Sequence, residues 1–310
     1  MLALITVTAL LAQAEPMKYG KVEIQEKDGK TIVTVGGDLV IVEEGQDTTK
    51  IKLGKKGVTI IEDEDGTSSV EWEDLQNLED QEAEAPGDDD NDDNGKRHNS
   101  KFKPHWAGLE MGINNYVNGD WSMNVDPSYM DLNTGRSWNF NLNFMEYGIG
   151  LGTDKIGLVT GLGIEWMNYH FDGNNIIVEN DAGLIEELPI TTGAVQRAKF
   201  QTTYLTVPAL LEFQVPVGKK RLYLSGGVVG GVKIGSKTKV VYTVNGDKQK
   251  DKAKDDFNLN SLRYGFTARL GYRGLKMYAT YYPMSLFETG KGTGGDALYP
   301  FAVGLTLLTF

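Results

Sequence analysis

The charged residues best placed to do chemistry lie on alternating, Gly-rich segments after residue 104. Acids come first and bases follow, as Glu110, Glu146, Glu165, Glu212, Lys233, Arg263, Arg269 and Lys276. Each is in phase with the polar residues of its segment, so we expect all of them to point into one interior. Buried charges are costly unless they are paired. We therefore predict a hydrogen-bonded ion-pair network that fills this interior as a structural plug; passage of ions or protons, or catalysis, is the alternative.

The segments that carry these charges are predicted to be β-strands joined by connections of two alternating lengths. The connections at 118–136, 172–199, 245–256 and 287–298 are long and polar, whereas those near Thr153, Gly218 and Arg273 span a few residues. Long outer loops that alternate with short periplasmic turns are typical of an up-and-down outer-membrane barrel. A soluble lipocalin-like barrel has no need of this alternation. The eight expected strands cover about 105–117, 137–152, 156–171, 200–217, 220–244, 257–273, 275–286 and 299–310.

The alternation within the strands indicates which face meets lipid. Between 138 and 144, Trp, Phe and Leu residues alternate with Asn139, Asn141 and Asn143. The apolar phase then slips, which predicts a β-bulge near Met145. An apolar outer face around a polar interior is the reverse of a soluble barrel. An eight-stranded barrel has an interior just wide enough for side chains to fill, so we expect the inward charges to close it.

The chain ends with an apolar segment whose final residue is Phe310. In an outer-membrane barrel the last strand closes against the first, and an aromatic residue at its end lies at the membrane interface. We therefore assign barrel closure to Phe310. Leu305 and Leu307 are out of phase with it, so we expect either a bulge near Leu307 and Leu308 or a Phe310 that lies beyond the lipid-facing band.

The first hundred residues differ from the rest in charge and in aromatic content. Residues 1–100 hold 10 Lys and Arg against 24 Asp and Glu, whereas residues 101–310 hold 21 against 19. Residues 1–14 are predicted to be a signal peptide, with an apolar stretch before Ala12-Gln-Ala14. Residues 15–74 are predicted to be a small β-rich module, 75–104 an acidic disordered linker, and 105–310 the barrel.

The β-rich module is expected to be either a small sheet or solenoid-like. Its clearest signal is Asp28-Gly29 between two alternating runs, which favours a hairpin. It has too few large apolar residues for an independent core of any size. We therefore expect the module to need a partner or the barrel rim for its stability, and residues 15–100 to contact another protein of the cell envelope.

Signals for enzymatic or metal chemistry are weak. The chain has no cysteine and 3 His residues. His170, with Asp172 and Ser137, could make a Ser-His-acid set, but a His at the barrel rim favours an interfacial role. Asp90-x-Asp92-x-Asn94-Gly95 resembles the start of a calcium-binding loop, yet position 12 is Lys101 instead of Glu. We expect no enzymatic activity, no cofactor and no metal site.

Residues 105–310 resemble the porin-family outer-membrane β-barrels that include PorT-like proteins and share the architecture of the OmpA barrel. The resemblance lies in Tyr204-Leu-Thr-Val-Pro-Ala-Leu-Leu211, the Gly-rich strands and Phe310. PorT-like relatives are associated with protein secretion, so the resemblance implies a role in envelope structure, assembly or secretion. A small-solute channel, and a surface-binding barrel that uses the loops 118–136 and 172–199, are the alternatives. We expect an outer-membrane protein that contacts lipid and no nucleic acid, with its N-terminal module in the periplasm.

Overall fold

The structure is a computed structural model that describes residues 102–218 and 220–309, and the backbone of six strands between Val22 and Asp74. Its contacts divide the chain into two compact units, Met1–Asn94 and Gly95–Phe310. The predicted signal peptide, the predicted closing residue Phe310 and most of the predicted linker lie outside the described residues.

The described part of the first unit is an antiparallel sheet in which each strand pairs with the next along the chain. β1 and β2 pair with Lys27 opposite Lys30, which leaves the two residues Asp28 and Gly29 between them, where the hairpin was predicted. β6 was not predicted, because Val70 and Trp72 are its only large apolar residues among acids and serines. The six strands are β1 (Val22–Lys27), β2 (Lys30–Val35), β3 (Val40–Glu44), β4 (Thr48–Leu53), β5 (Lys56–Glu62) and β6 (Ser68–Asp74).

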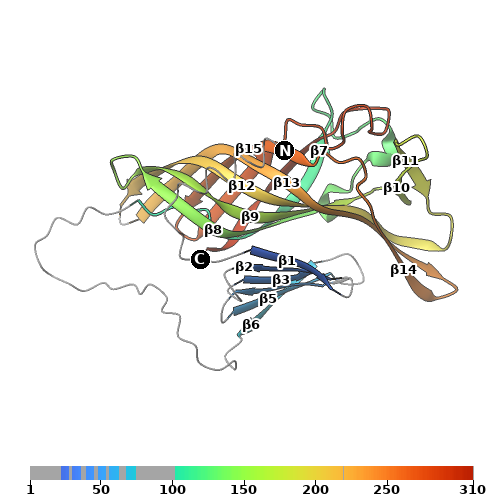
Figure 1. The fold of residues 1–310 in the computed structure, drawn as a ribbon, viewed down its shortest axis with the longest axis horizontal. Helices are drawn as coiled ribbons and strands as arrows, with labels where there is room; N and C mark the ends of the chain where they lie inside the picture. Colours follow the sequence, from blue (N-terminus) through green and yellow to red (C-terminus); the bar gives the residue numbers. More distant parts are fainter. Residues whose placement is uncertain are drawn as a thin grey trace, which may run out of the picture. The chain divides into compact units, whose positions relative to one another are not determined.

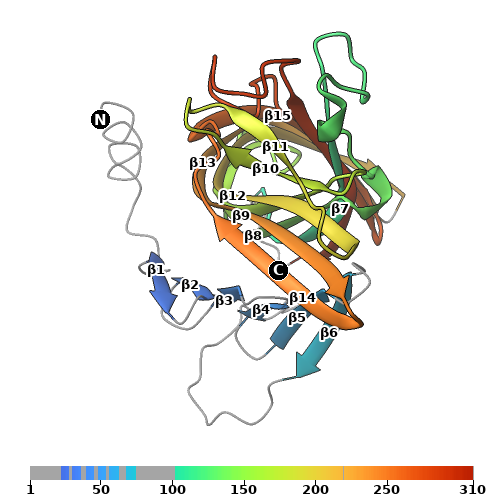
Figure 2. The ribbon, with the colours of Figure 1, turned by 90° about the vertical axis from the view of Figure 1, so that its right-hand side faces the viewer.

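The second unit is a closed antiparallel barrel (Figure 1). Its strands follow the order β12-β9-β8-β7-β17-β16-β15-β13, and the pairing of β12 with β13 closes the ring. Figure 2 views this ring along its length, with the long connections in front. The predicted eight-stranded barrel is therefore confirmed. Its strands are β7 (Gly108–Val117), β8 (Trp138–Gly150), β9 (Ile156–His170), β12 (Ala194–Val217), β13 (Lys220–Val244), β15 (Leu262–Tyr272), β16 (Leu275–Tyr281) and β17 (Tyr299–Thr309).

Two bulges occur where the sequence predicts them. The register of β8 against β9 shifts between Asn143 and Met145. The register of β17 against β7 shifts between Thr306 and Leu308, which leaves Leu307 without an opposite residue. Each bulge restores the inward and outward alternation that the apolar pattern had broken.

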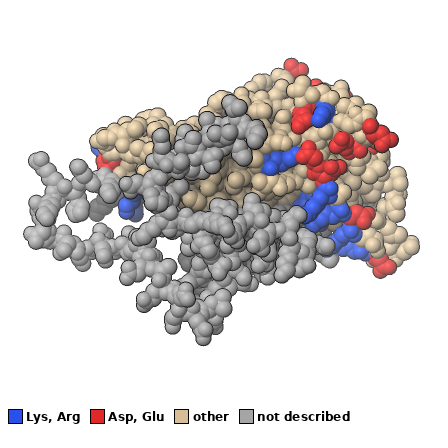
Figure 3. All heavy atoms as spheres, viewed as in Figure 1, with Lys and Arg blue, Asp and Glu red and all other residues tan. Residues whose placement is uncertain are grey.

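The outward face of the barrel carries an apolar band on every strand of the ring. Apolar side chains that would be anomalous on a soluble barrel are exposed, such as Leu262 (55%), Phe266 (55%) and Leu275 (59%). In Figure 3 charged side chains gather toward the ends of the barrel, and the visible surface between them is mostly tan. The band includes Ile113, Tyr147, Ile149, Leu158, Val207, Leu211, Phe213, Leu224, Val228, Val232, Tyr264, Met277, Val303 and Leu305. Within the described residues, no helix has the length and apolar character needed to cross a membrane.

Two predicted loops contain strands. The segment 245–256 was predicted to be a loop because it has Lys and Asp in place of apolar residues, but β14 (Asp247–Lys254) pairs there with β13. The turn between them is Asn245-Gly246, and both residues have positive φ (52° and 91°), as a two-residue hairpin turn requires. Residues 172–199 hold a second hairpin, β10 (Asn175–Glu179) with β11 (Ile185–Pro189), and the start of β12. Two short 3-10 helices, η1 (Ser128–Met130) and η2 (Thr134–Arg136), lie between β7 and β8.

Candidate functional site

The candidate site is the lumen, and its middle layer holds two of the predicted ion pairs. Arg269 on β15 donates both Nη atoms to Glu110 on β7, with Nη2 at 3.1 Å from Oε2. Asn141 Nδ2 (3.1 Å) and Thr306 Oγ1 (3.3 Å) donate to the same carboxylate. Glu110 is fully buried. This is the forked geometry of an Arg–carboxylate pair, in which further donors satisfy the remaining lone pairs.

The second ion pair lies next to the first and is held mainly by aromatic residues. Arg263 Nη2 donates to Glu165 Oε2, and Tyr282 Oη donates to the same oxygen at 2.7 Å. The Arg263 guanidinium lies 3.6 Å from the ring centre of Tyr204 and 4.0 Å from that of Tyr282. Cation–π contacts stabilise a guanidinium best where water is excluded. Asn139 links the two ion pairs, since its Nδ2 donates to Glu165 (3.2 Å) and its Oδ1 accepts from Asn141 (3.1 Å), which also donates to Glu110.

The other two predicted acids do not pair with the predicted bases. They hold residues 102–107, a segment that precedes the first strand and that we call the strap. Glu146 Oε2 accepts from the backbone N–H groups of Trp106 and Ala107, both at 2.8 Å. Glu212 accepts from the backbone N–H of His105 at 3.2 Å and lies 2.8 Å from its Nδ1. Two carboxylates inside the barrel thus fix the strap.

The strap places the rings of Phe102, Pro104 and Trp106 in one end of the lumen. We call this end, where the short turns between strands lie, the turn end. The ring of Phe102 occupies the space that Gly157 leaves open, because a Cβ there would lie 2.4 Å from the ring. A Cβ on Gly148 would lie 2.8 Å from Pro104. Trp106 lies under Arg269, whose guanidinium is 4.1 Å from its ring centre. Residues 102–104, which the predicted linker 75–104 includes, therefore pack against barrel strands.

The two remaining predicted bases are not paired with the four acids. Lys233 binds Asp256, through its carboxylate and also its carbonyl oxygen (3.2 Å), toward the long loops. Lys276 makes no ion pair within the part of the chain that the structure describes, although Glu146 and Glu212 act on it electrostatically. The eight residues therefore divide into two ion pairs, two carboxylates that bind the strap, and two lysines near the ends of the lumen.

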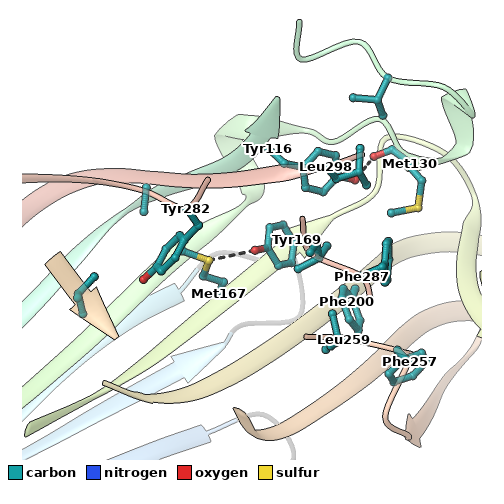
Figure 4. Packing of buried hydrophobic residues seen from close by; sticks show 14 of the residues in the cluster. Tyr116, Met130, Met167, Tyr169, Phe200, Phe257, Leu259, Tyr282, Phe287 and Leu298 are labelled. Carbon is teal, nitrogen blue, oxygen red and sulfur yellow. Dashed lines mark hydrogen bonds between the residues drawn. The ribbon is translucent and has the colours of Figure 1, made fainter. Parts of the chain in front are cut away.

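The opposite end of the lumen, the loop end, is closed by an apolar cluster (Figure 4). Tyr169 and Phe200 stack with ring centres 6.0 Å apart, and Phe257 packs edge-on against Phe200 at 5.2 Å. The loops add Met130, whose carbonyl accepts a hydrogen bond from Tyr116, and Leu259. Further buried members are Ile177, Ile185, Leu286, Phe287 and Leu298. Side chains from strands and from loops thus form one core over the lumen.

The Ser-His-acid set that the sequence allowed is not assembled. Ser137 Oγ accepts from the backbone N–H of His170 (2.9 Å) and donates to the carbonyl of Asn133 (2.9 Å). The His170 imidazole Nδ1 lies 3.0 Å from the carbonyl oxygen of Phe171. The hydroxyl and the imidazole are each engaged with backbone, so His170 is not placed to activate Ser137.

The strap is the part of the site that sequence reasoning missed. Its signal was present, since Phe102, His105 and Trp106 stand directly before the first strand, and Gly148, Gly150 and Gly157 lie together where β8 turns into β9. Such glycines permit the close approach of another group.

The comparison with protein families agrees with this geometry. The model of the family described as outer membrane protein beta-barrel domain matches residues 105–289. The chain belongs to this family. The match supports a location in the outer membrane, with the apolar band of the barrel in contact with lipid. A comparison with curated proteins found no match.

Proposed function

We propose that this protein is a closed, non-conducting outer-membrane barrel that acts in envelope structure, assembly or secretion through a protein partner. The observation that carries the proposal is that the described lumen is filled at three levels: the apolar cluster, the two ion pairs and the strap. An eight-stranded barrel leaves little room beside such side chains. A small-solute channel would require these buried contacts to rearrange, which counts against the porin alternative.

Planar-bilayer recording of the purified full chain tests whether the lumen is closed. We expect no stable conductance steps, while a porin of 16 strands added to the same bilayer as a control gives steps readily. The proposal would be overturned by reproducible conductance steps from the full chain. These steps should disappear when an antibody against the protein is added or when the protein is denatured beforehand.

The strap supports a periplasmic position for residues 15–100. The chain enters the barrel at the turn end, where Gln214 Nε2 donates to the carbonyl of Lys103 at 2.6 Å. Short turns of outer-membrane barrels face the periplasm, so residues before the strap would emerge on that side. Secretion is included among the roles because of the resemblance of Tyr204-Leu-Thr-Val-Pro-Ala-Leu-Leu211 to PorT-like strands. This is an argument by analogy.

A co-purification experiment tests the partner. Tagged full-length protein and a variant that lacks residues 15–100 are extracted from membranes in mild detergent, and both barrels are checked for folding by heat-modifiable gel mobility. We expect one or more envelope proteins to co-purify with the full chain and to be lost with the deletion. Equal recovery with the barrel alone would show that the N-terminal region does not bind the partner.

A second candidate function, surface binding, is favoured by how firmly the long loops are tied together. Asn118 Nδ2 donates to Asp296 at 2.8 Å, and Asn258 Nδ2 donates to the carbonyl of Gly183 at 3.0 Å. The hydrogen bonds from Asn118 and from the N–H of Asp126 hold the pKa of Asp296 below its usual range. The hydrogen bonds to the ionised Asp296 are therefore formed at neutral pH, and they weaken as the pH falls through that lowered pKa. Replacing 175–189 by a short Gly-Ser linker should reduce the adhesion of whole cells if this function is correct.

A further inference from the structure

Two exposed cations lie on neighbouring strands at the turn end of the barrel. Lys220 begins β13, and Arg273 directly follows β15. The pairing of these two strands ends with Leu222 opposite Tyr272, so both cations lie just beyond the last paired residues. Neighbouring strands are about 4.8 Å apart. The two side chains can therefore reach the same anionic group.

The side chain of Lys220 points away from the lumen. Lys220 has the phase of Leu224, which is 50% exposed on the outer face of β13. Arg221 has the opposite phase, and its Nη1 donates at 3.0 Å to Oε1 of Gln214 on the lumen side. The chain thus places one cation on each side of the wall at this point, and Lys220 is the outer one.

Arg273 lies on the same outer surface, in a backbone conformation that an arginine rarely adopts. With Gly274 it forms the turn between β15 and β16, and its φ is 55°. This left-handed region favours Gly, Asn and Asp, and strained positions of this kind cluster at functional sites. The guanidinium lies 5.2 Å from the ring centre of Tyr272, whose side chain has the outward phase of Leu270.

Neither cation is neutralised by an acid. Lys220 and Arg273 are both exposed, and neither makes an ion pair within the residues that the structure describes. At the turn between β8 and β9, by contrast, Asp154 pairs with Arg221 at 2.7 Å. Two like charges on neighbouring strands repel each other. The pair therefore favours an anion that contacts both side chains.

The two cations lie where the apolar band ends. On β13 the outward residues from Leu224 to Ile234 are apolar or Gly, and this run matches the about 9–11 residues that cross a bilayer. Lys220 precedes the run. On β16, Leu275 is 59% exposed directly after the turn that holds Arg273. The cations therefore lie at the height of the lipid phosphates, with apolar side chains next to them on the hydrocarbon side.

We propose that Lys220 and Arg273 bind the phosphate of an anionic phospholipid in the periplasmic leaflet. A guanidinium binds phosphate oxygens in a fork, and an ammonium adds a second, compact charge. The acyl chains of the same lipid would lie along Leu224 and Leu275. Short turns of outer-membrane barrels face the periplasm, which gives the leaflet. The proposal goes beyond the proposed function, since it concerns the lipid-facing surface and not the lumen.

The acidic segment 79–93 of the chain is the other candidate for these two charges. A peptide would have to be ordered to reach them, which costs conformational entropy, and exposed ion pairs contribute little in return. Lipid headgroups are already present at this height, because the apolar side chains beside the cations are in contact with lipid. A phospholipid therefore matches both the charges and the apolar surface.

Binding of phospholipids to the full chain in zwitterionic nanodiscs tests the proposal. The probes are phosphatidylglycerol and phosphatidylcholine with the same acyl chains, added at increasing fractions and detected by native mass spectrometry. The test variant combines Lys220→Gln with Arg273→Gln. The matched control combines Lys103→Gln with Lys155→Gln, which removes two exposed cations of the turn end outside the site. A third variant, Lys220→Arg with Arg273→Lys, keeps both charges.

We expect the wild type to prefer phosphatidylglycerol, and the test variant to lose about 10- to 30-fold in affinity for it. The control and the charge-keeping variant should bind as the wild type does, with unchanged heat-modifiable mobility in all. Equal affinity of the test variant and the wild type, or an equal loss in the control, would overturn the proposal. So would carbodiimide cross-links from residues 79–93 to Lys220 that added phosphatidylglycerol does not reduce.

The substitution Arg273→Asn separates lipid binding from the stability of the turn. Asn accepts positive φ more readily than Arg, so the urea midpoint of unfolding should be unchanged or higher. The affinity for phosphatidylglycerol should nevertheless fall about 5-fold, since one of the two charges is lost. A lower midpoint with unchanged lipid affinity would show that Arg273 serves the turn and not a lipid, and would contradict the proposal.

Discussion

The two ends of the lumen are closed by different kinds of chemistry. At the loop end, aromatic and aliphatic side chains from strands and several loops pack together, in a buried cluster that continues through the lumen to Phe102 and Trp106. At the turn end, one short segment is held by the carboxylates of Glu146 and Glu212 and by rings that fit over glycines. Apolar packing is distributed over many contacts, whereas the strap depends on a few directed ones. Closure of the loop end thus depends on many weak contacts, and closure of the turn end on a few directed ones.

This difference suggests where a partner could act on the barrel. A protein that binds residues before 102 would apply its force to the strap directly, since Lys103 and His105 connect the segment to Gln214 and Glu212. The two ion pairs in the middle layer lie beyond Trp106 and are satisfied independently of it, except for the contact of Arg269 with its ring. Release of the strap should therefore leave the middle of the lumen closed.

The largest loss of unfolding free energy is expected for a substitution in the middle layer of the lumen. Arg263→Ala leaves Glu165 buried without its cation, and breaking a buried pair from one side costs about 3–5 kcal/mol. The matched control is Arg221→Ala, which breaks the partly exposed pair with Asp154 at 2.7 Å and should cost about 1 kcal/mol or less. Urea-induced unfolding in detergent micelles, followed by Trp fluorescence, measures both. Equal losses would show that the middle layer is no better shielded from water than the turn end.

A loss of unfolding free energy is also expected for Leu259→Ala. The structural effect of this substitution should be confined to the loop end. The side chain is fully buried in the apolar cluster, and removing it should cost about 2–5 kcal/mol. Leu188→Ala, on β11 and 47% exposed, serves as the control. Because the cluster ties the loops together, hydrogen exchange should rise in 257–261 and 283–298 and stay unchanged at the strap. Faster exchange at both ends would mean that the two closures are coupled.

A smaller effect at the turn end is expected for Gly157→Ala. The new Cβ would lie 2.4 Å from the Phe102 ring, and such overpacking costs about 1–3 kcal/mol. Phe102 can relieve it by leaving the lumen, so chymotrypsin should cleave after Phe102 or Trp106 several times faster. Gly274→Ala is the control, since its Cβ would meet no atom within 4 Å. Unchanged cleavage in Gly157→Ala would show that the strap is held more firmly than its few contacts suggest.

Sequence reasoning predicted most of the barrel because each strand follows one simple physical rule. Apolar residues that face lipid alternate with polar ones that face the lumen, and the two places where this phase slips, near Met145 and Leu307, are the two bulges. The same rule failed for β14, whose side chains are nearly all exposed. A strand exposed on both faces needs no apolar phase, so the Asn245-Gly246 turn was the sequence signal that remained for it.

The pairing of the lumen charges could be predicted only in part. The phase of each strand predicts that a side chain points inward, but its partner depends on height and on strands far apart in sequence, as for Glu110 with Arg269. Glu146 and Glu212 were expected to join the ion-pair network with the bases, but they accept hydrogen bonds from backbone N–H groups instead. A segment of chain that re-enters the barrel supplies donors that no side-chain pattern reveals.

Removal of a tyrosine hydroxyl in each of two regions compares the ion-pair layer with the apolar cluster most directly. Tyr282→Phe removes a hydroxyl that donates at 2.7 Å to the ionised Glu165, and Tyr116→Phe removes one that donates to the neutral carbonyl of Met130. Hydrogen bonds to charged groups contribute about 1.5–3 kcal/mol and those between neutral groups about 0.5–1.5 kcal/mol. Both tyrosines are buried, so burial does not account for the expected difference. Urea unfolding should therefore show the larger loss of unfolding free energy for Tyr282→Phe. A larger loss for Tyr116→Phe would contradict this. It would mean that the hydrogen bond of Tyr116 matters more to the apolar cluster than the hydrogen bond of Tyr282 matters to the ion pair.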